Sequence, residues 1–242
     1  MHRNIKAVII KPNSYKKEKD FAVVYLLHGA YGTFDNWIKK VPALQKHADD
    51  YKILIVCPDG ANNSWYFDSP IDSAYRFETH VALEVPAFID ANYKTKKDRK
   101  FRAITGLSMG GHGAMFIAFR HAEAFGACGS MSGALNISEI TKGYDVAKRL
   151  GNADSNKQIY NDRSVLNVIE KYPKDSLAII IDCGLQDFII GMSQAVHTKL
   201  VSLKIPHDYI ERPGKHDWFY WENAVGYQLL FFKNYFDKAN KL

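Results

Sequence analysis

The stretch that most constrains the fold is residues 100–119, where a serine stands between glycines at a change of secondary structure. The pentapeptide Gly106–Gly110, Gly-Leu-Ser-Met-Gly, follows an apolar segment typical of a strand and precedes one typical of a helix. A serine on such a tight turn has a strained backbone and an exposed Oγ, and glycines flank it because a Cβ would clash with the adjoining strand and helix. The pattern predicts that Ser108 is a nucleophile; the alternative is a plain glycine-rich turn.

Apolar runs that alternate with helical patterns predict the architecture around this turn. Continuous apolar strands separated by helices are typical of a parallel sheet with both faces covered. The expected strands are residues 5–10, 21–28, 52–57, 100–106, 126–131, 177–183 and 207–212. The expected helices are residues 37–48, 76–92, 109–121, 191–204 and 217–237. The sequence therefore predicts an α/β fold with a mostly parallel central sheet and helices on both faces.

The length of the chain suits one domain. With 242 residues, of which 47% are hydrophobic, residues 1–242 are sufficient for a single α/β domain with a large core. Residues 135–172 are polar and show no sheet pattern, so we expect a short insertion over the top of the sheet, above the active site. The chain enters a β pattern at residue 5, and we expect that a leader or a first strand preceded residue 1.

Composition argues against several classes of function. The formal net charge is +6, but the basic residues are scattered and lack the interleaved aromatic residues of a nucleic-acid surface. No stretch approaches the roughly 20 apolar residues of a membrane span. No metal-ligand cluster and no cofactor motif emerge, so we expect neither a metal nor a cofactor. The cysteines have no metal or redox spacing and are expected to be buried free thiols: Cys57, Cys128 and Cys183.

A nucleophilic serine needs a base, and the position of the histidines indicates which one. In open α/β sheets, functional groups gather at the carboxyl ends of the strands. His216 is the only histidine after the final expected strand, in the loop before the last helix. His207 begins that strand and should lie at the opposite edge of the sheet. Surface or packing roles are expected for the histidines in helical runs: His47, His80, His121 and His197.

The orienting acid is chosen in the same way. Asp187 comes just after the strand 177–183 and can turn back toward a histidine, whereas Asp182 lies inside that strand. Asp217 is a further alternative. The order Ser108, Asp187, His216 along the chain is that of α/β-hydrolases and differs from the chymotrypsin and subtilisin orders. We therefore predict these three as the catalytic residues.

An acyl-transfer site also needs hydrogen-bond donors for the oxyanion of the tetrahedral intermediate. One is expected to be the backbone N–H of Met109, directly after the nucleophile. The other should come from the loop after strand 21–28, where glycines let the backbone approach closely. Ala30 is the candidate and Tyr31 the alternative. His28 is expected to hold this loop and not to serve as a second base.

Loop 58–75 follows a strand and should lie at the same edge of the sheet. It carries the candidate substrate-binding residues Trp65, Tyr66 and Asp68. Trp65 can stack on a sugar or aromatic ring, or it can plug the space beneath the loop. Trp218 lies close enough to His216 to border the pocket, although core packing is the alternative.

Five ordered motifs resemble the esterase D family of α/β-hydrolases, which includes S-formylglutathione hydrolases, tributyrin and feruloyl esterases, and mycolyltransferases. The motifs are Leu26–Gly32, Pro58–Tyr66, Gly106–Gly111, Cys183–Asp187 and Gly214–Trp218. The resemblance covers nearly the whole chain and is greatest to the tributyrin and feruloyl esterase branch. It implies a Ser-His-Asp carboxylesterase, without a cofactor, on the α/β-hydrolase fold.

The expected function is that of a serine carboxylesterase acting on short-chain acyl or hydroxycinnamoyl esters, as small molecules or linked to polysaccharide. Two alternatives stay open: an acyltransferase of the mycolyltransferase type, and a non-catalytic carbohydrate-binding module on a hydrolase scaffold. The resemblance and the start within a strand favour an exported protein over a cytoplasmic one. The oligomeric state has no signature in the sequence.

Overall fold

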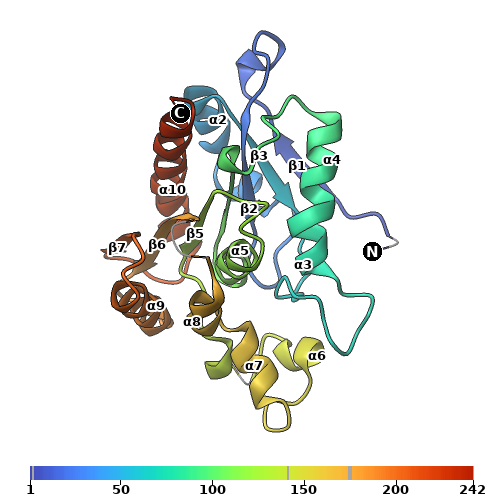
Figure 1. Ribbon diagram of the computed structural model, residues 1–242, viewed down its shortest axis with the longest axis vertical. Coiled ribbons are helices and arrows are strands. Elements are labelled where there is room, and N and C mark those ends of the chain that lie inside the picture. The colour runs from blue at the N-terminus through green and yellow to red at the C-terminus, as the bar shows by residue number, and fades with distance from the viewer. Residues whose placement is uncertain (2, 141, 174–175, 242) are drawn as a thin grey trace.

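A seven-stranded sheet forms the centre of the computed structural model, which describes residues 1, 3–140, 142–173 and 176–241 (Figure 1). The strands are β1 Ala7–Ile10, β2 Ala22–Leu27, β3 Ile53–Pro58, β4 Arg102–Gly106, β5 Ala127–Met131, β6 Ala178–Gly184 and β7 Asp208–Arg212. Their order across the sheet is β1-β3-β2-β4-β5-β6-β7. Strands β2 to β7 pair in parallel, and β1 pairs with β3 antiparallel. The mostly parallel sheet expected from the sequence is confirmed.

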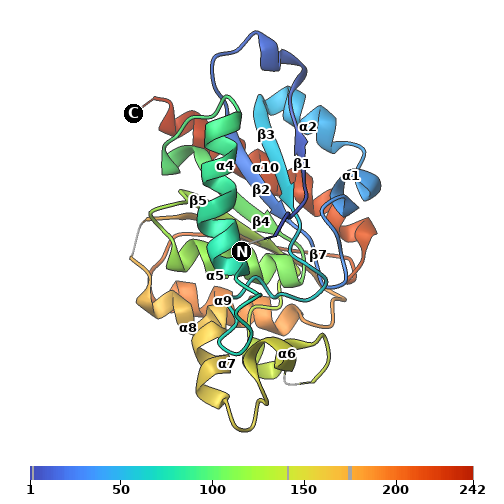
Figure 2. The same cartoon turned by 90° about the vertical axis from the view of Figure 1, so that its right-hand side faces the viewer.

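Helices cover both faces of this sheet (Figure 2). They are α1 Asn36–Lys40, α2 Leu44–Tyr51, α3 Phe77–Thr79, α4 Val85–Asn92, α5 Met109–Arg120, α6 Val146–Leu150, α7 Lys157–Arg163, α8 Val165–Val168, α9 Ile190–Ser202 and α10 Trp218–Ala239. Helices α4, α5 and α9 pack on one face, and α1, α2 and α10 on the other.

The period of two along each strand divides the apolar residues between two cores. In β2, Val23 and Tyr25 join the cluster beneath α4, α5 and α9, whereas Val24 and Leu26 join the cluster beneath α2 and α10. Every residue of β2 is buried, because both faces of the strand are covered. This is why the strands appear in the sequence as continuous apolar runs.

Two expected helices differ in detail, and proline explains both differences. The expected helix 37–48 is two helices, because Pro42 lies between α1 and α2 and the residue before it, Val41, has non-helical backbone angles, with φ −130° and ψ 78°. The expected helix 76–92 is continuous from α3 to α4 but includes a π-helical turn at His80–Glu84. Pro86 follows this turn and has no N–H for a regular helical hydrogen bond, so the wider turn accommodates it.

The insertion expected at residues 135–172 carries α6, α7 and α8 and forms one end of the molecule (Figure 1). It packs on the loop that follows β3. The Trp65 Nε1 donates to the carbonyl of Tyr144 at 2.9 Å, and the Ser69 hydroxyl donates to the carbonyl of Arg149 at 2.7 Å. Side-chain donors thus hold the insertion against the loop at the carboxyl ends of the strands.

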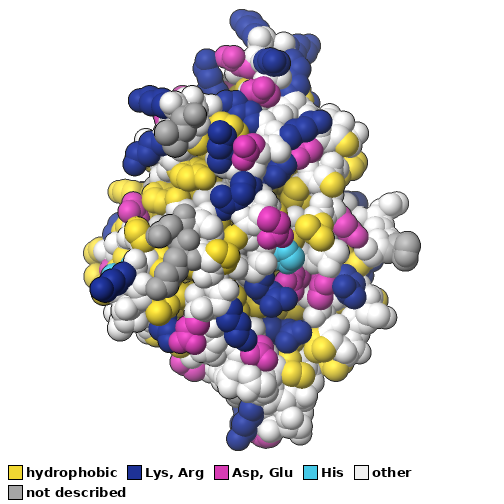
Figure 3. Space-filling model, in the orientation of Figure 1, with side chains coloured by type: hydrophobic (Ala, Val, Ile, Leu, Met, Phe, Trp, Pro, Cys, Tyr) yellow, Lys and Arg dark blue, Asp and Glu magenta, His cyan; other side chains and the backbone are white. Residues whose placement is uncertain are grey.

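The surface and the cysteines agree with the composition. Basic and acidic side chains are interspersed on the face shown in Figure 3. All three cysteines are free and buried, as the sequence predicts. Among the described residues, no helix is both long enough and apolar enough to cross a membrane.

His112 of α5 is expected to make the stability of the fold depend on pH. Its Nε2 donates to the carbonyl of Arg163 at 2.9 Å, and burial lowers the pKa of the ring to about 4 from an ordinary value of 6.5. Between those two pH values the unfolded chain binds a proton that the folded chain excludes. The free energy of unfolding therefore falls as the pH drops from 6.5 to 4, by up to about 3 kcal/mol from this residue.

The variant His112→Phe keeps an aromatic ring beside Phe67 and Phe116 and removes the titration. We expect urea unfolding at pH 7, 5.5 and 4.5 to show a weaker loss of stability with falling pH in this variant than in the wild type. Equal slopes in the two proteins would contradict the assignment.

Candidate active site

The backbone of Ser108 adopts a strained conformation between β4 and α5. Its φ is 53° and its ψ is −118°, in a backbone region that residues other than glycine rarely adopt. A Cβ at Gly110 would lie 2.5 Å from the carbonyl oxygen of His28, and one at Gly106 would lie 2.7 Å from that of Leu27. The glycines are therefore required by close approach to the end of β2, for the reason expected from the sequence.

Ser108, His216 and Asp187 come together from the ends of three strands, β4, β7 and β6. The Nε2 of His216 lies 3.0 Å from the Oγ of Ser108, and its Nδ1 lies 2.9 Å from Oδ2 and 3.0 Å from Oδ1 of Asp187. An ionised carboxylate only accepts hydrogen bonds, so Nδ1 carries the proton and Nε2 is free to accept from the serine hydroxyl. This is the arrangement in which imidazole can act as a base toward serine.

The environment of Asp187 keeps it ionised. Burial alone would raise the pKa of this carboxyl, but hydrogen bonds from the His216 ring and the Ile189 N–H outweigh burial and hold the pKa below its ordinary value. The carboxylate can therefore stabilise the imidazolium that forms when His216 takes a proton.

The alternative acids are engaged elsewhere. Asp182 is fully buried, where it accepts from the Tyr220 hydroxyl and from Arg212 Nη2 at 2.6 Å. Asp217 caps α10 by accepting from the Tyr220 N–H at 3.0 Å. The structure brings neither of them to His216, so the geometry favours Asp187 among the three candidates.

The N–H groups predicted to bind the oxyanion are not used in hydrogen bonds within the described part of the protein. Within the described residues, the backbone N–H groups of Ala30 and Met109 donate to no acceptor in the protein, whereas the Tyr31 N–H donates to the carbonyl of Asn62. The Met109 N–H is free because it lies in the first turn of α5, where the helix supplies no carbonyl. A Cβ at Gly29 would lie 3.4 Å from the Cβ of Ser108, so the loop that carries Ala30 reaches the serine closely. These observations favour Ala30 over Tyr31.

His28 holds this loop in place, as the sequence predicts. Its Nε2 accepts from the Gly60 N–H at 2.8 Å, so Nδ1 carries the proton and donates to the carbonyl of Gly29 at 2.8 Å. Burial lowers the pKa of the ring. Both nitrogens are engaged with backbone groups, and His28 is therefore not positioned as a second base.

The candidate substrate residues of loop 58–75 are mostly structural. Trp65 is 2% exposed and Tyr66 is fully buried, with its hydroxyl donating to the carbonyl of His28 at 3.0 Å. Asp68 accepts from Arg76 Nε and the Thr79 N–H, both at 3.0 Å. Of the two roles left open for Trp65, the geometry favours the one in which it supports the loop from beneath over stacking on a ring of the substrate.

Two exposed aromatic side chains that the sequence analysis did not name as substrate contacts, Phe188 and Tyr31, lie beside predicted site residues, and the predicted pocket residue Trp218 lies nearby. Phe188 is 68% exposed, and its ring centroid lies 4.7 Å from that of His216. Tyr31, next to Ala30, is 61% exposed and lies 6.3 Å from Tyr144 of the insertion. Trp218 is partly buried, edge-on to Trp37 at 5.2 Å. Their positions in the sequence could have indicated such contacts, because Phe188 and Tyr31 each directly follow a predicted site residue.

Comparisons with known proteins agree with the geometry of this site. Residues 1–232 match the sequence profile of a protein family described as "Putative esterase". The chain belongs to this esterase family. It is accordingly a carboxylic ester hydrolase, and the family resemblance expected from the five motifs is confirmed.

Individual relatives cover much of this esterase. An acetyl esterase from Caldicellulosiruptor saccharolyticus is 27% identical over 231 residues, which cover 89% of this chain and 86% of the relative. A diacylglycerol acyltransferase/mycolyltransferase from Mycobacterium bovis is 30% identical over 143 residues, or 55% of this chain and 41% of the relative. The solved structure of a ferulic acid esterase matches with a TM-score of 0.81 at 28% identity, covering 95% of this chain and 92% of that chain. The α/β-hydrolase fold is thereby confirmed.

A single methyl group at the turn tests the close packing around Ser108. In the variant Gly110→Ala, the new Cβ would meet backbone atoms of Leu27 and His28 at 2.5–2.8 Å, and we expect a loss of about 2–3 kcal/mol in the free energy of unfolding. The matched control is Gly191→Ala in α9, where a Cβ meets nothing within 4 Å. In chemical denaturation, the free energy of unfolding of the control should equal that of the wild type or slightly exceed it. A Gly110→Ala protein as stable as the wild type would disprove the packing argument.

Proposed function

We propose that this esterase is a serine carboxylesterase that hydrolyses short-chain acyl or hydroxycinnamoyl esters through an acyl-enzyme on Ser108. The observation that carries the proposal is the 3.0 Å contact between Ser108 Oγ and His216 Nε2, with Asp187 paired to the other ring nitrogen. Acyl transfer requires a chain of three hydrogen-bonded groups: a reactive serine, a ring nitrogen that can accept its proton, and an ionised carboxylate.

In the proposed mechanism His216 takes the hydroxyl proton of Ser108 as Oγ attacks the ester carbonyl. The carbonyl oxygen becomes an oxyanion that accepts hydrogen bonds from the N–H groups of Met109 and Ala30. His216 then gives its proton to the leaving alcohol, and the acyl group stays on Ser108. Water repeats the sequence, with His216 again as the base, and releases the carboxylic acid. No metal or cofactor enters any step.

The first test is hydrolysis of p-nitrophenyl esters from acetate to octanoate, beside methyl ferulate. We expect the wild type to turn over and Ser108→Ala to lose at least about 10⁴-fold in kcat/KM. The chain-length profile of the wild type then reports the size of the acyl site. A folded wild type that is inert on every ester would contradict the esterase proposal.

The role of Asp187 can be separated from a general effect of removing a carboxylate. Asp187→Asn is expected to reduce kcat by about 10³–10⁴-fold, because the amide no longer stabilises the required tautomer and charge of His216. Asp217→Asn is the matched control, since asparagine also caps helices and Asp217 faces the start of α10. Equal losses in the two variants, measured on the same ester, would refute the assignment of the acid.

The acyl-enzyme can also pass its acyl group to an alcohol. The similarity to a diacylglycerol acyltransferase/mycolyltransferase supports this second candidate. Adding glycerol to the ester assay distinguishes the two, because a transferase forms the glycerol ester while a hydrolase releases only the free acid. A non-catalytic carbohydrate-binding module would bind glycans and hydrolyse nothing, which the assembled triad argues against.

Phe188 and Tyr31 support the choice of substrate class. The exposed ring of Phe188 lies against His216, and the exposed Tyr31 directly follows Ala30, so a flat aryl group on the ester has an apolar surface to contact. The similar acetyl esterase and ferulic acid esterase agree with short acyl and hydroxycinnamoyl groups, respectively.

We expect Phe188→Ala to raise KM for methyl ferulate about five- to tenfold and to change KM for p-nitrophenyl acetate by less than about twofold. The control is Phe88→Ala, which removes a similarly exposed ring from α4. Steady-state kinetics with both esters provide the measurement. An equal effect of Phe188→Ala on the two substrates would show that this ring does not contact the aryl group.

A further inference from the structure

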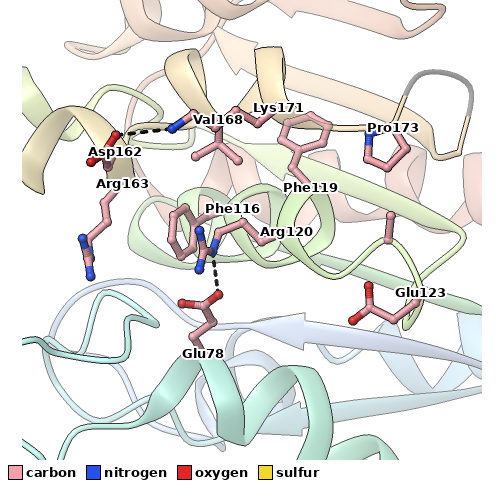
Figure 4. Close-up of a pocket in the computed structure, with 11 residues that line it drawn as sticks. Glu78, Phe116, Phe119, Arg120, Glu123, Asp162, Arg163, Val168, Lys171 and Pro173 are labelled. Carbon is pink, nitrogen blue, oxygen red and sulfur yellow. Dashed lines mark hydrogen bonds and ion pairs between the residues drawn. The ribbon is translucent and has the colours of Figure 1, made fainter.

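A cavity of about 610 Å³ lies between α5 and the insertion, away from the triad (Figure 4). Residues from α3, the last turns of α5, α7, α8 and the segment after α8 line it. Ser108 immediately precedes α5, whereas Arg120 at the cavity is the last residue of that helix. At a rise of about 1.5 Å per residue, the α5 residues that line the cavity, from Phe116 to Arg120, lie about 12–18 Å along the helix from Ser108.

One part of the cavity wall is apolar. Phe116 and Phe119 from α5 and Val168 from α8 line it and belong to the hydrophobic core. Ala122 and Pro173 extend this surface toward the rim. The exposed fractions of Phe116, Phe119 and Val168 are small, at 1%, 3% and 5%, so with Ala122 and Pro173 they form a narrow apolar strip. An organic group can contact this strip, whereas a small inorganic ion cannot use it.

The charged side chains at the cavity are paired, with one exception. Arg120 Nε donates to Glu78 Oε1 at 2.6 Å, and Lys171 Nζ lies 3.5 Å from Asp162 Oδ1, as the dashed lines in Figure 4 mark. Arg163 also lines the cavity. Over the ranges that the structure describes, its guanidinium makes no hydrogen bond and no ion pair.

The unpaired guanidinium is partly withdrawn from water. Arg163 is half-buried, and burial lowers its pKa, although a guanidinium stays protonated at any pH the protein meets. Removing a charge from water without a partner costs free energy that an anion can recover. The planar fork of donors matches the two oxygens of a carboxylate in particular.

We propose that this cavity binds a carboxylate with an apolar body, whose oxygens pair with Arg163 and whose body lies on the narrow apolar strip. The site is separate from the triad and does not depend on the proposed esterase activity. Acids released by ester hydrolysis belong to the same chemical class, so the product of the reaction is one source of such a ligand.

Binding of 4-phenylbutyrate, measured by titration calorimetry, tests the role of Arg163. We expect Arg163→Gln to weaken binding about tenfold or more, because a charge-assisted pair is lost. The matched control is Lys157→Gln, which removes the same charge from the exposed start of α7, outside the cavity, and should alter affinity less than about twofold. Equal affinity in wild type and Arg163→Gln would overturn the proposal.

A second measurement needs no variant at Arg163 and locates the ligand. In methyl NMR spectra of the wild type, 4-phenylbutyrate should shift the signals of Val168, assigned through Val168→Ile, while the neutral 4-phenylbutanol should shift them only weakly. Binding that leaves Val168 unshifted would place the acid elsewhere, at the triad included, and overturn the proposal. If inorganic phosphate bound as tightly as 4-phenylbutyrate, the proposal that the ligand needs an apolar body would be overturned.

Discussion

The close approach of the β4–α5 turn to the end of β2 is the constraint on which the site depends. A Cβ at Gly106 or Gly110 would meet backbone oxygens of β2 and its loop, so only glycine allows α5 to begin there. This contact holds Ser108 in its strained conformation and leaves the Met109 N–H without a helical acceptor. The proposed nucleophile and one proposed oxyanion donor thus depend on the same backbone packing.

A second layer of polar contacts positions the loops around this turn. His28 joins the oxyanion loop to the loop after β3 through Gly29 and Gly60, and the Tyr66 hydroxyl adds a bond to the carbonyl of His28. Trp65 then connects the loop after β3 to the insertion. Residues that look like ligand contacts in the sequence therefore act as supports, and they leave the exposed surface to Phe188 and Tyr31.

Much of the architecture could be predicted, because each buried parallel strand is continuously apolar and each helix has its own period. All seven expected strands are present, and the two differences among the helices occur at Pro42 and Pro86. That Ser108, Asp187 and His216 lie together could also be predicted, since their positions directly after strands place them at one edge of the sheet. The roles of Trp65 and Tyr66 could not, because a large aromatic residue in a loop can pack beneath it or face the solvent, and only the neighbouring segments decide which.

By itself the sequence determined the strands, the order Ser108, Asp187, His216, and the glycines that the turn requires, because these depend on local patterns and on the rule that parallel strands end at one edge. The tertiary structure decided which groups are free to react. Among the described residues, it leaves the Ala30 N–H without an acceptor, whereas the Tyr31 N–H donates to Asn62. It also places Asp182 in a buried ion pair and leaves the half-buried guanidinium of Arg163 at a cavity with no partner among those residues. Whether a polar group is satisfied depends on neighbours distant in the chain, so no local pattern encodes it.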